Sequence, residues 1–117
     1  MTAMRLMSLP THAALELAAG IALMFVPFVV GFSPAGLVAS VTVGVIIVGF
    51  ALWASTPEGN LIPVTAHFAY DRGMLLGLLV GALLLGLHGD RGAALALGIA
   101  AIWQLALNTT TRYSQAA

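Results

Sequence analysis

Four long apolar runs follow one another along the chain, separated by short polar segments. None of the runs shows the period-2 alternation of a half-buried strand. A membrane-spanning helix needs about 20 mostly apolar residues, so the first three runs are long enough and the fourth is marginal. The pattern predicts an all-α integral membrane protein with four transmembrane helices, at about residues 12–32, 37–54, 66–87 and 93–107.

Composition identifies the solvent of this chain. Hydrophobic residues make up 61% of the 117 positions and charged residues only 7%, with a mean hydropathy of +1.06. A soluble domain has about 25% charged residues, so we expect the lipid bilayer to be the principal partner. The net charge is zero and the sequence has no lysine, which excludes a basic face for nucleic acid. The sequence also has no cysteine, which excludes disulfides and thiolate metal sites.

Local signals refine these helices. We expect the Thr11 hydroxyl to cap the first helix. Pro27 removes one backbone hydrogen bond inside the first run, so the helix should kink or end there, and a neighbouring helix must cover the freed carbonyl. Aromatic residues near the helix ends are expected to anchor one membrane interface: Trp53, Tyr70, Trp103 and Tyr113.

A polar pair occurs twice, at the start of the first run and at the start of the third. His12 and Glu16 recur as His67 and Asp71 at the same offset, since 67 − 12 = 55 and 71 − 16 = 55. This repeat predicts two tandem helix hairpins of the same orientation, with both polar pairs on one membrane face. The expected organisation of the single membrane domain 1–117 is a hairpin at 8–55, a connector at 56–66, a hairpin at 67–108 and a polar tail at 109–117.

Small residues four apart follow each polar pair. Such ridges allow two helix backbones to approach closely in lipid. We therefore expect the first and third helices to cross along them, which would bring the two polar pairs together. The alternative is that the ridges face lipid or a second subunit. The two ridges are Ala14, Ala18 and Ala22, and Gly73, Gly77 and Gly81.

The first half resembles the SPW-repeat proteins, small bacterial membrane proteins built from two-helix repeats. The resemblance rests on the polar pair with Gly20, on Val26-Pro27-Phe28 followed by Gly31-Phe32, and on Leu61-Ile62-Pro63-Val64 before the second pair. Val26-Pro27-Phe28 stands where the family has Ser-Pro-Trp, and the third run has no proline. The resemblance implies the hairpin topology and a bacterial inner membrane, but it implies no reaction.

The paired histidines and acids are the candidate polar cluster. Residues four apart share a helix face, so each pair can form a local ion pair or hydrogen bond. The favoured interpretation is an interfacial anchor that fixes how the hairpins dock. A divalent metal site, a proton relay or pH sensor, and haem or quinone ligation are the alternatives. No catalytic constellation is present, so we expect neither enzymatic activity nor a bound cofactor or metal.

The placement of arginine predicts the orientation. Arg5, Arg72 and Arg112 fall on one side of the predicted membrane and Arg91 on the other, which places both termini in the cytoplasm by the positive-inside rule. We expect a structural or accessory role, as a homo-oligomer or with other membrane subunits. The alternative is a small transporter, channel or proton-relay protein that uses the polar cluster.

Overall fold

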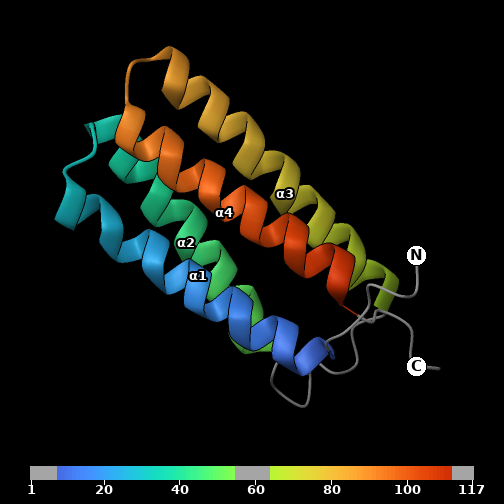
Figure 1. Ribbon diagram of the computed structural model, residues 1–117. Coiled ribbons are helices and arrows are strands. Elements are labelled where there is room, and N and C mark those ends of the chain that lie inside the picture. The colour runs from blue at the N-terminus through green and yellow to red at the C-terminus, as the bar shows by residue number, and fades with distance from the viewer. Residues whose placement is uncertain (1–7, 55–63, 112–117) are drawn as a thin grey trace.

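The computed structural model describes residues 8–54 and 64–111, which form four helices. They alternate in direction, so that α1 and α3 begin at the end of the molecule where α2 and α4 finish (Figure 1). All four are long and apolar enough to cross a membrane. The protein is therefore an all-α, four-helix chain and, by helix length and composition, a multi-pass membrane protein. The helices are α1 (Leu9–Val30), α2 (Pro34–Ala54), α3 (Val64–Leu87) and α4 (Arg91–Thr110).

Two helix ends differ from the sequence predictions. Ser8, not Thr11, caps α1, because the Ser8 hydroxyl accepts the Thr11 backbone N–H at 3.4 Å. The fourth helix is longer than expected, since Asp90 caps it through the Ala93 N–H and Asn108 and Thr111 at its C-terminal end are buried rather than solvated. The predicted connector 56–66 lies mostly outside the described residues, as do Tyr113 and most of the predicted tail.

Pro27 lies inside α1 without ending it, and the helix continues to Val30. Proline cannot donate a hydrogen bond to the carbonyl four residues earlier, which is that of Leu23. The Ser40 hydroxyl of α2 donates to this carbonyl at 2.6 Å. The prediction that a neighbouring helix covers the freed carbonyl is therefore confirmed.

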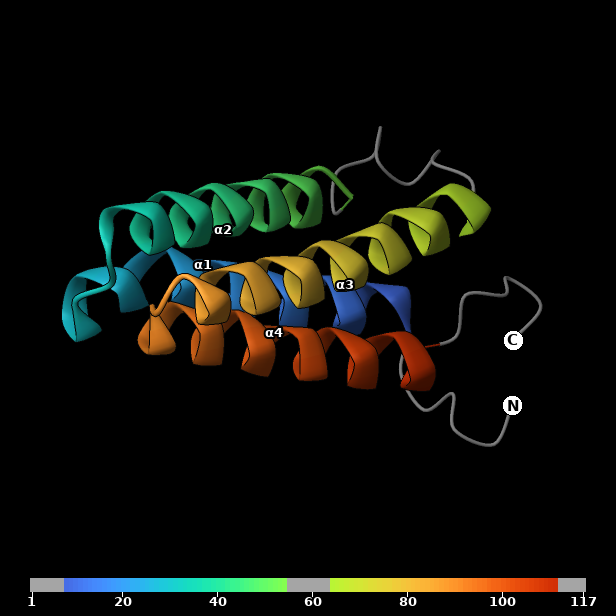
Figure 2. The ribbon, with the colours of Figure 1, turned by 90° about the horizontal axis from the view of Figure 1, so that it is seen from above.

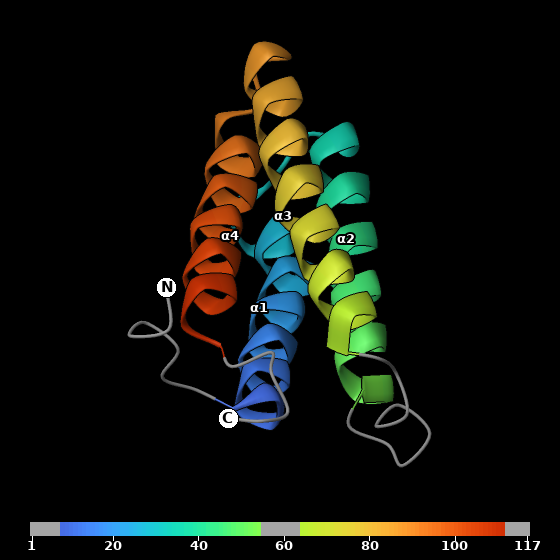
Figure 3. The ribbon, with the colours of Figure 1, turned by 90° about the vertical axis from the view of Figure 1, so that its right-hand side faces the viewer.

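Helices pack most closely within each hairpin, α1 against α2 and α3 against α4. Figure 2 shows α3 running obliquely from near the end of α2 to the start of α4, and Figure 3 shows the four helices running lengthwise up the view. Between the hairpins, the bundle interior is filled mostly by aliphatic side chains. Its main members are Leu23, Ile47, Leu78, Leu85, Ala93 and Leu97.

The expected crossing of α1 and α3 along their small residues is wrong. Ala14, Ala18 and Ala22 are exposed, and a Cβ atom added at Gly73 or Gly77 would meet no atom within 4 Å. A Cβ atom at Gly81 would instead meet Leu97 of α4, at 3.1 Å. A small residue permits close approach on any side and does not determine which helix packs there. Among the glycines of the described residues, Gly20 and Gly44 are the ones whose added Cβ atom would meet the backbone of another helix, and they join α1 to α2.

The two short loops are tied together at the end opposite the polar pairs. Asp90, before α4, accepts the Ser33 backbone N–H at 2.8 Å and the Ser33 hydroxyl at 2.5 Å. The same hydroxyl accepts the Gly36 N–H at the start of α2. The Ser33 hydroxyl and the Ala93 N–H hold the pKa of the Asp90 carboxyl below its ordinary value. The loop before α4 therefore links the two hairpins through Asp90 and is more than a solvated turn.

Asp90→Asn should lower thermal stability at pH 7, because an amide nitrogen cannot accept the Ser33 N–H. The folded-state pKa of Asp90 is lowered, so its contribution is complete above the unfolded pKa of about 4 and disappears as the pH falls through the folded pKa. The difference in melting temperature between wild type and variant in detergent should therefore narrow below about pH 4. If this difference in melting temperature stays constant from pH 7 to pH 3, the loss of stability does not depend on the charge of the Asp90 carboxylate.

Candidate functional site

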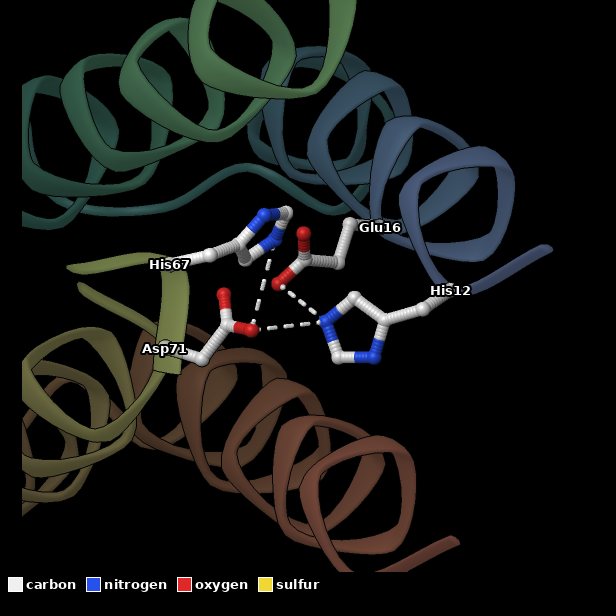
Figure 4. A group of neighbouring side chains, drawn as sticks. All are labelled: His12, Glu16, His67 and Asp71. Atoms are coloured by element: carbon white, nitrogen blue, oxygen red, sulfur yellow. Dashed lines mark ion pairs between the residues drawn. The ribbon is translucent and has the colours of Figure 1, made fainter. Parts of the chain in front are cut away.

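The two polar pairs meet inside the bundle, about one to two turns from the starts of α1 and α3. We call His12, Glu16, His67 and Asp71 the quartet. All four side chains are buried and point towards one another (Figure 4). One potential ligand atom from each residue lies within 4.8 Å of the others. The convergence expected from the repeat is therefore present, although the small-residue ridges do not produce it.

His12 and Asp71 form the central link between the hairpins. His12 Nε2 lies 3.0 Å from Asp71 Oδ2 and 3.2 Å from Glu16 Oε2. His67 Nε2 lies 3.5 Å from the same Asp71 oxygen, and the two imidazole rings stand edge to face at 5.7 Å. Asp71 thus contacts a histidine from its own hairpin and one from the other.

Three polar side chains of α4 and its cap hold the quartet in place. Gln104 Nε2 donates to Glu16 Oε2 at 2.8 Å and to Asn108 Oδ1 at 2.9 Å. Asn108 Nδ2 donates to the Asp71 carbonyl at 3.3 Å, and Thr111 Oγ1 lies 2.6 Å from His12 Nδ1. Residues 104, 108 and 111 fall on one helix face. This spacing is visible in the sequence, but none of the three residues was assigned to the site from the sequence alone.

The Thr111 contact fixes the state of the His12 ring. The Thr111 hydroxyl donates its single hydrogen to the Leu107 carbonyl. Its oxygen must therefore accept from His12, which places a proton on Nδ1. Nε2, the other ring nitrogen, is then the atom directed at the carboxylates of Glu16 and Asp71.

Aromatic residues of α2 and α3 form one wall of the site. Phe50 stands edge to face against the His67 ring at 5.1 Å and stacks on Tyr70 at 3.7 Å. The Tyr70 hydroxyl donates to the Ile46 carbonyl of α2. Tyr70 therefore joins two helices in addition to lying near the expected interface.

Of the other predicted interface anchors that the structure describes, one lies at a helix end and one bonds to another helix. Trp53 is half exposed at the end of α2, as an interfacial residue should be. The Trp103 indole donates to the Leu15 carbonyl of α1 at 3.2 Å and borders an apolar groove of about 410 Å³ between α1 and α4. Ala18 and Ala22 line this groove, so the ridge of the first helix faces α4 rather than α3.

Beyond the quartet the bundle interior becomes apolar. Among the described residues, the buried polar side chains other than the quartet are Ser40, Gln104, Asn108 and Thr111. Only Ser40 lies towards the opposite loops, where its hydroxyl is bonded to the Leu23 carbonyl. In the part of the chain that the structure describes, no line of polar side chains connects the two ends.

The fold and the site together define a class: a four-helix membrane bundle with a histidine–carboxylate quartet buried near one end. Comparison with protein-family models, curated proteins and solved structures finds no match for this chain. The resemblance to SPW-repeat proteins stays a prediction.

Proposed function

We propose that the protein is a structural or accessory component of the bacterial inner membrane, acting as a homo-oligomer or as a small subunit of a larger membrane complex. Both termini are placed in the cytoplasm by the arginine distribution. The observation that carries the proposal is the closed interior. The quartet is bonded to itself and to α4, and the buried side chains beyond it are mainly aliphatic.

This interior argues against the rival role of a transporter or channel. A path for protons or ions needs polar groups or water along the bundle, and ionisable residues in membranes usually mark such paths. Here the buried ionisable groups of the described residues, which are the quartet, lie at one end, and Leu78 and Leu97 fill the centre. The quartet therefore supports a docking role for the two hairpins better than it supports conduction.

The outer surface supports association within the membrane. Gly73 and Gly77 are exposed on α3, with no atom near their missing side chains. Exposed Leu76 and Val80 flank them. Such a surface suits a second transmembrane helix, because close backbone contact contributes to helix association in lipid. This is the oligomer interpretation that the sequence left open.

Gly77→Leu should leave the melting temperature of the single chain nearly unchanged, because the position is exposed and an added Cβ atom meets no other helix within 4 Å. If α3 docks on a partner, the same change should reduce the size of the complex extracted in mild detergent. Native gels and mass measurement of the extracted complex check this. Leu76→Ala is the matched control, since it alters the same surface without blocking close approach.

Two outcomes would contradict the proposal. One is a wild-type protein that is monomeric and without co-purifying subunits after gentle extraction. The other is proton or cation flux in liposomes that Asp71→Asn abolishes, which would favour transport instead.

A further inference from the structure

We infer that the quartet is a binding site for one divalent transition-metal ion, with His12 and His67 as nitrogen ligands and Glu16 and Asp71 as oxygen ligands. This inference goes beyond the proposed function, because it requires the quartet but neither an oligomer nor a partner. A failed metal titration would not contradict the accessory role. A protein that proves monomeric and without partners would likewise not contradict metal binding.

The distances within the quartet are close to those of a coordination shell. In a tetrahedral site with metal–ligand bonds of about 2.0–2.2 Å, neighbouring ligand atoms lie about 3.3–3.6 Å apart. The three contacts between histidine nitrogens and carboxylate oxygens measure 3.0, 3.2 and 3.5 Å. With all four ligand atoms inside 4.8 Å, the widest pair needs to close by about 1 Å to reach a shared ion.

Residues outside the quartet orient its ligands. Metal-bound histidine usually donates its second ring N–H to an oxygen acceptor, which fixes the tautomer. Thr111 has this role for His12, since it accepts from Nδ1 and leaves Nε2 directed at the quartet centre. Gln104 likewise positions the Glu16 carboxylate. These supports come from the end of α4, which contributes no ligand of its own.

The charge balance favours a divalent ion. Two neutral imidazoles and two carboxylates carry a charge of −2, which a divalent cation neutralises. A neutral complex is the favourable state for a buried site in a membrane bundle, where an isolated charge is costly. Imidazole and carboxylate groups bind a metal in their deprotonated forms, so metal binding releases any proton that the ligand atoms carry.

The ligand set indicates the kind of metal. Two imidazoles with two carboxylates and no thiolate suit Zn²⁺ and neighbouring ions such as Co²⁺ better than Mg²⁺ or Ca²⁺, which prefer all-oxygen sites. Zn²⁺ is the expected ligand, and Co²⁺ is its spectroscopic substitute.

Titration of the purified full chain in detergent with Co²⁺ tests the inference. We expect one ion per chain, a visible absorption band of four-coordinate cobalt, displacement by Zn²⁺ but not by excess Mg²⁺, and a rise in melting temperature with Zn²⁺. His67→Gln should weaken binding by about 100-fold or more, and Thr111→Val, which removes no ligand but takes away the support of His12, by about 10–100-fold. His67 makes the longest of the three contacts, so its replacement disturbs the metal-free fold least.

His88 provides the matched control. It is exposed in the loop at the opposite end, and His88→Ala should leave the titration unchanged. The inference is overturned if wild type binds no Co²⁺ at stoichiometric concentration. It is equally overturned if folded His67→Gln binds as wild type does, or if His88→Ala abolishes the signal.

Discussion

Asp71→Leu should lower the stability of the protein by about 3–5 kcal/mol, the range found when one partner of a buried ion pair is removed. Asp71 is fully buried and its Oδ2 lies near both quartet histidines, 3.0 Å from His12 and 3.5 Å from His67. The leucine would leave these imidazoles and Glu16 without the group that joins the hairpins. Unfolding by a denaturing detergent, followed by helix content, measures the loss.

Replacing all four quartet residues with apolar residues of similar volume is the informative comparison. Removing a whole buried ionic group is often neutral or stabilising, because no charge remains to be desolvated. We expect this fourfold variant to regain most of the stability that Asp71→Leu loses. If Asp71→Leu alone loses less than about 1 kcal/mol, the quartet does not hold the hairpins together.

The fourfold variant also separates the two roles of the site. A quartet that serves only to dock the hairpins could be replaced by aliphatic residues, which lack its desolvation cost. A quartet that binds metal cannot be replaced in this way, because aliphatic side chains supply no ligand atoms. A stable fourfold variant that keeps its complex size but loses the Co²⁺ binding of the wild type would therefore show that metal binding requires the ionisable residues, whereas folding and assembly do not.

The sequence was sufficient for the parts of the fold that depend on local pattern. Apolar runs gave four helices, and the repeated spacing of His12 and His67 predicted that the polar pairs share one end. Pro27 required a donor from another helix, and Ser40 supplies it. Each of these inferences follows from backbone hydrogen bonding or helix periodicity, which act within a few residues or a single helix.

The partners of each helix face could not be predicted in the same way. The glycines at 73 and 77 form the clearer small-residue pattern, yet they are exposed, while Gly20 and Gly44 bring the backbones of α1 and α2 together. A small residue removes a steric barrier on any side, so the whole bundle determines which ridge is used. The support from Asn108 and Thr111 was missed because the fourth helix was expected to end at about residue 107.

Gly44→Leu tests the contact that replaces the predicted crossing, and it should separate α1 from α2. A Cβ atom at this position would lie 2.7 Å from the Gly20 carbonyl oxygen and 2.8 Å from Met24 Cγ. Backbone cannot move aside as a side chain can, so the helices themselves have to part. Overpacking of this kind costs about 1–3 kcal/mol for added methylenes, and a whole leucine against backbone should reach or exceed the upper value.

Gly49→Leu is the matched control on the same helix. Its position is exposed and a Cβ atom there would meet nothing within 4 Å. Leucine also has the higher helix propensity, by up to about 1 kcal/mol relative to glycine, so this variant should be neutral or slightly stabilising. The two substitutions add the same atoms to one helix, but only Gly44→Leu should lower the unfolding midpoint. Equal midpoints would mean that α1 and α2 do not meet at Gly20 and Gly44.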